Sequence, residues 1–234
     1  MRGGWLTRRG AAAALAVGVA TIWGMGWRGL VLLLAFFVSG SLLTRAAEGG
    51  GGQRTARQVV ANGGVAALAA LAGSWPAFAG ALAAATADTW ATEIGAFSRA
   101  APRLITSGAP VPRGTSGGIT LLGTCGGLAG AGVMAGLAAL PRGMAAGLAH
   151  PGRLGVVVGA AGIAGMLLDS LLGATLQGVF ECPRCGARTE RPDTICHEPV
   201  RLVRGFAWLD NDAVNLAATL VGAGFGALGW RFCC

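Results

Sequence analysis

The chain has 234 residues, of which 53% are hydrophobic and only 12% are charged. This composition excludes an ordinary soluble domain and indicates an integral membrane protein. Eighteen basic and ten acidic residues give a net charge of +8. All eighteen basic residues are arginine, which excludes lysine-based chemistry such as a Walker A phosphate loop or a Schiff base.

Seven apolar stretches have roughly the 20 residues that a membrane-spanning helix needs. Glycine and alanine dominate several of them, which suits helices that pack closely in lipid. The sequence therefore predicts an all-α fold, a single integral membrane domain over residues 1–234 that forms a polytopic transmembrane helix bundle of about seven helices. In chain order, the stretches are 11–27, 29–44, 58–74, 76–97, 114–140, 154–180 and 206–230.

The first stretch follows Arg2, Arg8 and Arg9, as the apolar core of a cleaved signal peptide would. No small-residue cleavage site precedes Trp23, however, and the second apolar stretch follows at once. We therefore expect the first stretch to remain as a helix of the bundle.

The arginines indicate how the bundle is oriented. With seven helices, the N-terminus and the loops 45–57, 98–113 and 181–205 share one side of the membrane, which carries all but four of the arginines. The positive-inside rule predicts that this side is cytoplasmic, in the inner membrane. A basic rim facing anionic lipid also explains the pI of about 10.8 without a nucleic-acid partner. The four exceptions are Arg28, Arg142, Arg153 and Arg231.

Polar side chains within or beside the apolar stretches gather at the predicted cytoplasmic ends of the helices. Each aspartate at the centre of a membrane helix costs about 2.5 to 3.5 kcal/mol, so this gathering predicts a shared site. The alternative for any single residue is a polar contact between helices or, for Asp210 and Asn211, a helix N-cap. The set comprises Asn62, Asp88, Glu93, Asp169, Gln177, Asn211, Asp212 and Asn215.

Helix geometry distinguishes the carboxylates of this set. Asp88 and Glu93 lie in "ADTWATEIG" and point about 140° apart around a helix, so they need not meet at one ligand. Asp169 lies on a stripe of small residues that a neighbouring helix can approach closely, which directs it into the bundle.

A glycine-rich segment lies between the fourth and fifth stretches, "PRLITSGAPVPRGTSGGIT" at residues 102–120. Such a turn, leading directly into a helix, can aim backbone N–H groups and two hydroxyls at an anion. Glycine-rich turns before helices are common, so this motif alone is ambiguous. Beside carboxylates that can hold Mg²⁺, it favours phosphoryl transfer. Its candidate phosphate-binding residues are Arg103, Arg113, Gly114, Thr115, Ser116, Gly117 and Gly118.

Five blocks give a specific resemblance, in order along the chain: "QVVANGG", "ADTWATEIG", "VPRGTSGGIT", "DSLLGATLQ" and "WLDNDAVN". They resemble the membrane family typified by transmembrane protein 19 and the chloroplast phytyl-phosphate kinase of vitamin E synthesis (domain of unknown function family 92, DUF92), from about Gln58 to Asn215. The resemblance implies an all-helical enzyme that transfers phosphate from a nucleoside triphosphate, typically CTP, to an isoprenoid monophosphate.

The resemblance also implies site residues. We expect Asp88, Glu93, Asp169 and Asp212 to be catalytic, with Mg²⁺ held by Asp88 and a partner such as Asp212 or Asp169. Ala109 and Pro110 stand where the family pattern leads us to expect a basic residue, which leaves Arg103 or Arg113 to supply the charge. The remaining residues that the resemblance marks are Asn62, Thr89, Thr115, Ser116 and Asn215.

The predicted cytoplasmic loop 181–205 contains "CPRCGARTERPDTICHE". Cytoplasmic thiols stay reduced, so a structural zinc is more plausible there than a disulfide. Cys182, Cys185, Cys196 and His197 are the candidate ligands, although adjacent Cys196 and His197 are closer than zinc knuckles usually place their second pair. Free thiols or a different fourth ligand are the alternatives. If zinc binds, we expect it to fold the loop that delivers Asp210 and Asp212.

Three functions compete at this stage. The first is a CTP-dependent kinase acting on phytyl or a similar prenyl monophosphate, with the lipid tail between helices in the bilayer. The second is a transporter or lipid-handling protein whose carboxylates bind a cation, but this predicts polar residues spread across the membrane rather than gathered at one end. The third is a nucleotidyl or phosphoalcohol transferase, and the Asp-rich signature of the CDP-alcohol enzymes is absent from the sequence.

Overall fold

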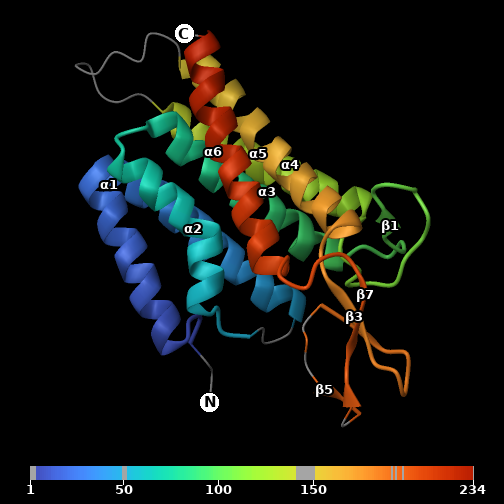
Figure 1. The fold of residues 1–234 in the computed structure, drawn as a ribbon. Coiled ribbons are helices and arrows are strands. Elements are labelled where there is room, and N and C mark those ends of the chain that lie inside the picture. Colours follow the sequence, from blue (N-terminus) through green and yellow to red (C-terminus); the bar gives the residue numbers. More distant parts are fainter. Residues whose placement is uncertain are drawn as a thin grey trace.

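The computed structural model describes residues 4–48, 52–140, 151–190, 192, 194–196 and 198–233, and it is mostly helical (Figure 1). The helices are α1 (Arg8–Glu48), α2 (Ala56–Leu71), α3 (Trp75–Ala96), α4 (Leu121–Ala139), α5 (Pro151–Thr175) and α6 (Asn211–Cys233). The strands, which the sequence did not predict, are β1 (Arg103–Leu104), β2 (Gly118–Ile119), β3 (Val179–Glu181), β4 (Arg188–Thr189), β5 (Thr194–Ile195), β6 (Glu198–Pro199) and β7 (Arg201–Arg204).

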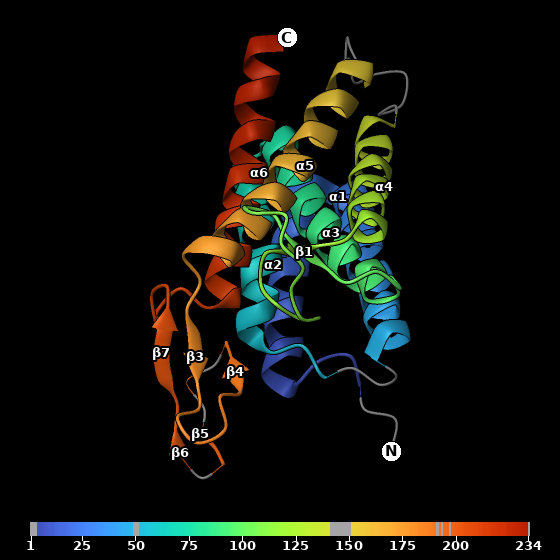
Figure 2. The same cartoon turned by 90° about the vertical axis from the view of Figure 1, so that its right-hand side faces the viewer.

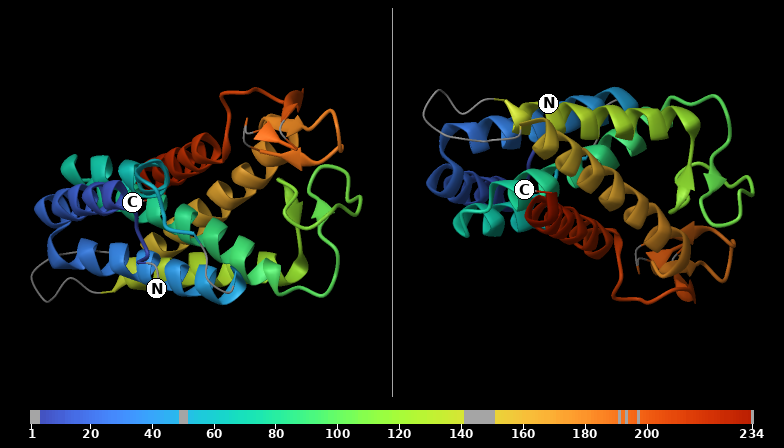
Figure 3. Two further views of the ribbon diagram at one scale, coloured as in Figure 1. Left: turned by 90° about the horizontal axis from the view of Figure 1, so that it is seen from below. Right: turned by 90° about the horizontal axis from the view of Figure 1, so that it is seen from above.

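Helix α1 consists of two helical segments joined at Gly26, whose φ of 65° lies in the left-handed region and interrupts the helix. Just before α1, Trp5 packs edge-on against Phe37 of the second segment, with ring centroids 5.6 Å apart. The two segments are therefore antiparallel neighbours, as the view from below shows (Figure 3). Stretches 11–27 and 29–44 both lie within α1, so the described residues form six helices where about seven were predicted.

Four of the described helices are long and apolar enough to cross a membrane, namely α1, α4, α5 and α6. Large apolar side chains cover their outward faces, including Trp23, Leu121 and Phe232, each more than 80% exposed. Exposing apolar surface over a whole bundle is unfavourable in water, whereas the hydrocarbon of a lipid bilayer can contact it.

Helix α3 lies at the centre of the bundle and packs against each of the other five helices (Figure 2). Residues 77–87 of α3 are all buried, and most of them are alanine. Small side chains allow several helices to approach one axis, which explains why this segment occupies the centre. The central position brings Asp88 into the interior.

Helices α3 and α6 meet at Gly80 and Gly222, where a Cβ on Gly80 would overlap the Gly222 carbonyl oxygen. We expect Gly80→Ala to force the helices apart and to cost about 1 to 3 kcal/mol. Thermal unfolding in detergent measures the loss. Gly136→Ala on α4 is the control, because nothing lies within 4 Å of its Cβ position. Equal midpoints for the two variants would contradict close packing at Gly80.

Helix α4 begins at Leu121, seven residues later than the predicted stretch 114–140. Gly114 and Gly117 have φ values of 81° and 77°, which an α-helix cannot accommodate. The Thr120 hydroxyl then caps the helix by accepting a hydrogen bond from Gly123 N at 3.0 Å. The glycine-rich turn therefore lies before β2 and does not run directly into the helix.

Helices α5 and α6 also differ from the predicted stretches, most of all at the ends that adjoin the cysteine loop. Helix α5 ends at Thr175 rather than 180, because the chain continues into β3 of the cysteine loop. Helix α6 begins at Asn211 rather than 206, where the Asp210 carboxylate accepts a hydrogen bond from Ala213 N at 3.0 Å.

The cysteine loop forms an antiparallel sheet of order β4-β3-β7 and a separate hairpin of β5 and β6. These strands lie at the same end of the molecule as the start of α1 (Figures 1 and 2). At the opposite end, the Arg28 guanidinium donates a hydrogen bond to the Leu140 carbonyl. Which end faces the cytoplasm stays a prediction from the arginines.

Candidate functional site

A cavity of about 490 Å³ lies at the strand-bearing end of the bundle, between α3, α4 and α5. Its walls are formed by the C-terminal part of α3, the first turn of α4, the last turns of α5 and the loop before α4. The chemically active lining residues are Asp88, Thr92, Arg113, Thr115, Ser116, Thr120, Thr124, Asp169, Ser170, Gln177, Glu190 and Asn211.

Asp88 and Asp169 face each other across the α3–α5 contact, where both line the same cavity and their carboxyl groups lie close enough to interact. A Cβ on Gly165 would overlap the Ala84 side chain, so the helices touch one turn before each aspartate. The sequence of small residues therefore brings the two carboxyls together. The sequence left two partners open for Asp88, namely Asp169 and Asp212, and Asp169 is the one that lines the cavity with it.

The carboxyl pair fits a divalent cation. Two carboxylates this close repel each other when both are ionised, and a cation bound between them removes this repulsion. Asp169 Oδ2 is buried and has no hydrogen-bond partner among the described residues. A buried oxygen without a partner is costly unless a ligand satisfies it, and carboxylate oxygens are the ligands that Mg²⁺ prefers.

The turn at residues 113–118 forms a second wall of the cavity. The Arg113 guanidinium donates to the carbonyls of Ala96 and Ser98, and thereby attaches the turn to the C-terminal end of α3. At the other end of the turn, a Cβ on Gly117 would lie 2.5 Å from the backbone nitrogen of Ala174 in α5. The turn is thus held between two helices that carry the aspartates.

The N-terminus of α4 also borders the cavity, through Thr120, Gly123 and Thr124. The positive end of the helix dipole favours an anion there, although Gly123 N and Thr124 N already donate to Thr120. Two segments that can bind phosphate therefore face the same carboxylate pair.

The cavity lining also includes Gln177, which belongs to the polar set predicted from the sequence, and Glu190, which does not. Glu190 accepts hydrogen bonds from the Ser116 hydroxyl and, at 2.9 Å, from Gln177 Nε2. Gln177 was visible as a polar residue beside an apolar stretch. Glu190 had no such signal, because it lies in a hydrophilic loop where charged residues are ordinary.

Glu93 faces away from the cavity, toward α1. Its carboxylate accepts a hydrogen bond from Thr44 Oγ1 at 2.6 Å and lies near the half-buried Arg54. Burial lowers the pKa of Arg54 below its ordinary value, while the negative charge of Glu93 opposes this. One turn of α3 therefore supplies two separate polar sites.

Five other predicted site residues also lie outside the lining of this cavity, including Thr89, which lies beside Gly40 of α1. Asp212 lies 3.5 Å from Arg57 Nε, and Arg103 donates to the Gly108 carbonyl at 2.8 Å. The amides of Asn62 and Asn215 each donate to a carbonyl one turn earlier in their own helix. Asn62 Oδ1 is buried and has no hydrogen-bond partner among the described residues.

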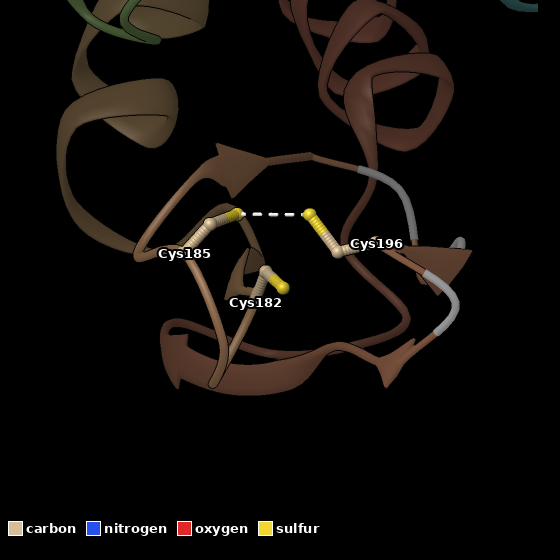
Figure 4. Close-up of side chains that lie close together, drawn as sticks. All are labelled: Cys182, Cys185 and Cys196. Carbon is tan, nitrogen blue, oxygen red and sulfur yellow. Dashed lines mark hydrogen bonds between the residues drawn. The ribbon is translucent and has the colours of Figure 1, made fainter.

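The sulfur atoms of Cys182, Cys185 and Cys196 lie within 4.8 Å of one another in the cysteine loop (Figure 4). Hydrogen bonds from the Ala187 backbone and from the neighbouring thiols lower the pKa of Cys185. The hydrogen bond to Cys185 raises the pKa of Cys196 to about 11. The fourth predicted ligand, His197, lies outside the described residues.

Comparison with known proteins gives the family. Residues 1–223 match the family described as "Integral membrane protein DUF92". The chain is 33% identical to Protein PGR of Arabidopsis thaliana, over 84% of this chain and 79% of that protein. It is 33% identical to an uncharacterized membrane protein of Methanocaldococcus jannaschii (95% and 85% covered) and 32% identical to one of Synechocystis sp. (93% and 80% covered). No solved structure matches significantly. The chain, as its sequence blocks predicted, belongs to the DUF92 family of integral membrane proteins.

Proposed function

We propose that the protein is a membrane isoprenoid phosphate kinase. It transfers a phosphoryl group from a nucleoside triphosphate, with CTP favoured, to phytyl or a similar prenyl monophosphate. The observation that carries the proposal is the shared cavity, in which the Asp88–Asp169 pair faces the 113–118 turn. Carboxylates for a metal and a cradle for phosphates are the two components that phosphoryl transfer requires.

The residues of the cavity have separate tasks in this proposal. Asp88 and Asp169 would hold Mg²⁺, which neutralises charge on the phosphates when bound. The 113–118 turn and the N-terminus of α4 bind phosphate oxygens, and Arg113 adds positive charge. The acceptor monophosphate is already ionised, so positioning and charge neutralisation supply most of the rate without a strong general base.

The prenyl chain leaves the cavity on its apolar side, between α4 and α5. Ile119, Met166 and Leu167 line the cavity there, and Leu167 is 47% exposed on the outer surface. An apolar chain at this position extends into lipid while its phosphate remains among the polar residues. We place this end on the cytoplasmic side of the inner membrane, where the nucleotide is.

The test uses purified protein with phytyl or geranylgeranyl monophosphate, Mg²⁺ and CTP, and measures formation of the prenyl diphosphate. We expect product that depends on both Mg²⁺ and nucleotide. We also expect nucleotide to raise the unfolding midpoint, since ligand at a hundred times its Kd contributes about 2.7 kcal/mol. Comparing CTP, ATP and GTP identifies the donor. No product with any nucleotide or prenyl chain refutes the proposal.

A further inference from the structure

The cysteine loop contains a cluster of donor atoms apart from the cavity. Cys182 and Cys185 lie in the turn between β3 and β4, and Cys196 lies in the turn between β5 and β6. Their sulfurs are all within 4.8 Å of one another. Thiolates around a tetrahedral Zn²⁺, with Zn–S of about 2.3 Å, lie roughly 3.8 Å apart, so one ion fits among the three with small movements.

Local backbone structure places these sulfurs together. Gly186 N donates to the Cys182 carbonyl and Cys182 N donates to the Ala187 carbonyl, both at 2.9 Å, which folds the first turn tightly. Cys196 has a φ of 53°, and no other non-glycine residue among those described has a positive value. Such a conformation costs about 1 to 3 kcal/mol and persists only where other interactions require it.

The loop lacks a hydrophobic core that could hold it folded. From β3 to the start of α6, only Phe180, Cys182 and Leu209 are buried hydrophobic residues among those described. A unit this small cannot bury enough apolar surface to offset its conformational entropy, and such units usually contain a metal or a disulfide. The three thiols are the groups in the described loop that can supply this cross-link.

The folded loop contacts the cavity at two points. Glu190, directly after β4, bonds to Ser116 and Gln177. Arg204, at the end of β7, donates to the carbonyls of Gly173 and Ala174 at 2.8 and 3.0 Å, which satisfies the C-terminal end of α5. The position of Glu190 beside the 113–118 turn therefore depends on the fold of the cysteine loop.

We propose that Cys182, Cys185 and Cys196 bind one structural Zn²⁺, and that this ion folds the cysteine loop so that Glu190 closes one side of the cavity. The ion takes no part in the reaction, because its ligands lie in the loop and not in the cavity lining. The three described sulfurs carry the metal site, and only the role of Glu190 rests on the proposed function.

Metal analysis of the purified full-length protein tests the site without any activity assay. We expect about one zinc per chain in the parent protein and at least a tenfold lower content in Cys185→Ser and Cys196→Ser. Cys125→Ser is the matched control, since Cys125 is an exposed thiol on α4 outside the cluster, and it should retain the metal. Zinc-free protein with three free thiols, or with a disulfide between Cys185 and Cys196, overturns the proposal.

Limited proteolysis tests the effect on the loop. Removal of zinc with a chelator should expose residues 181–205 to cleavage while the helices stay intact, and added zinc should restore protection. Equal cleavage with and without zinc overturns the folding role. Glu190→Gln should retain zinc but change the CTP concentration needed for thermal stabilisation. Zinc-bound protein that binds no nucleotide would refute the proposed function and leave the metal site standing.

Discussion

Asp88→Asn should reduce the rate of phosphoryl transfer by at least about 100-fold and abolish stabilisation by Mg²⁺ with nucleotide. An amide keeps the volume of the side chain but cannot replace a carboxylate as a ligand and charge partner of a divalent cation. The loss expected on removing such an electrostatic contribution is about 10² to 10³ in rate. Steady-state kinetics of the purified variant, with a Mg²⁺ titration, measures it.

Two comparisons separate catalysis from folding in this experiment. Without Mg²⁺, Asp88→Asn should unfold at the parent temperature or above it, because one of two adjacent acidic groups has been removed. Glu93→Gln changes a carboxylate on the same helix that faces α1, and it should lose far less activity. If Asp88→Asn keeps Mg²⁺-dependent activity within about threefold of the parent, Asp88 is not a metal ligand.

Gly117→Ala should abolish nucleotide binding and lower the unfolding temperature. The residue has a φ of 77°, and its Cβ would lie 2.5 Å from Ala174 N and 2.6 Å from Ala174 Cα. These are backbone atoms of α5, which cannot rotate aside as a flexible side chain can. The turn itself must therefore move away from the helix that carries Asp169. The left-handed conformation adds about 1 kcal/mol of strain for an L-residue.

Gly114→Ala is the matched control for this prediction. Gly114 has a φ of 81°, but nothing lies within 4 Å of its Cβ position. It should therefore show the conformational strain alone and retain most nucleotide binding. Measuring the unfolding midpoint and KM for CTP in both variants isolates the contact between the turn and α5. Equal behaviour of the two variants would show that this contact is unimportant.

The sequence predicted site residues best where burying the side chain in an apolar stretch costs free energy. Asp88 and Asp169 stand in apolar stretches, so a shared site followed from the energetic cost of each. Whether Asp88 pairs with Asp169 or Asp212 depends on which helix packs beside α3 and at what rotation. These are tertiary properties, and the resemblance to a family does not contain them either.

The local backbone geometry was predicted less well from the sequence than the apolar stretches and the buried carboxylates. The stretches 11–27 and 29–44 predicted a boundary close to Gly26, where α1 is interrupted, but nothing in the sequence indicated that this glycine has a φ of 65°. The strands are two to four residues long and have no periodicity that could be read. Glu190 reaches Ser116 across 74 positions of the chain, a contact that no local pattern indicates.

The central position of α3 has a consequence for the biogenesis of the protein. Among the described helices, α3 is not one of the four apolar enough to cross a membrane by composition. Its alanines and its acidic residues give it weak affinity for hydrocarbon, so the insertion machinery has little reason to release it into lipid alone. Helices α4, α5 and α6 emerge from the ribosome later and complete its surroundings. We therefore expect the segment that carries Asp88 to depend on its neighbours for insertion into the bilayer, and the site to form last.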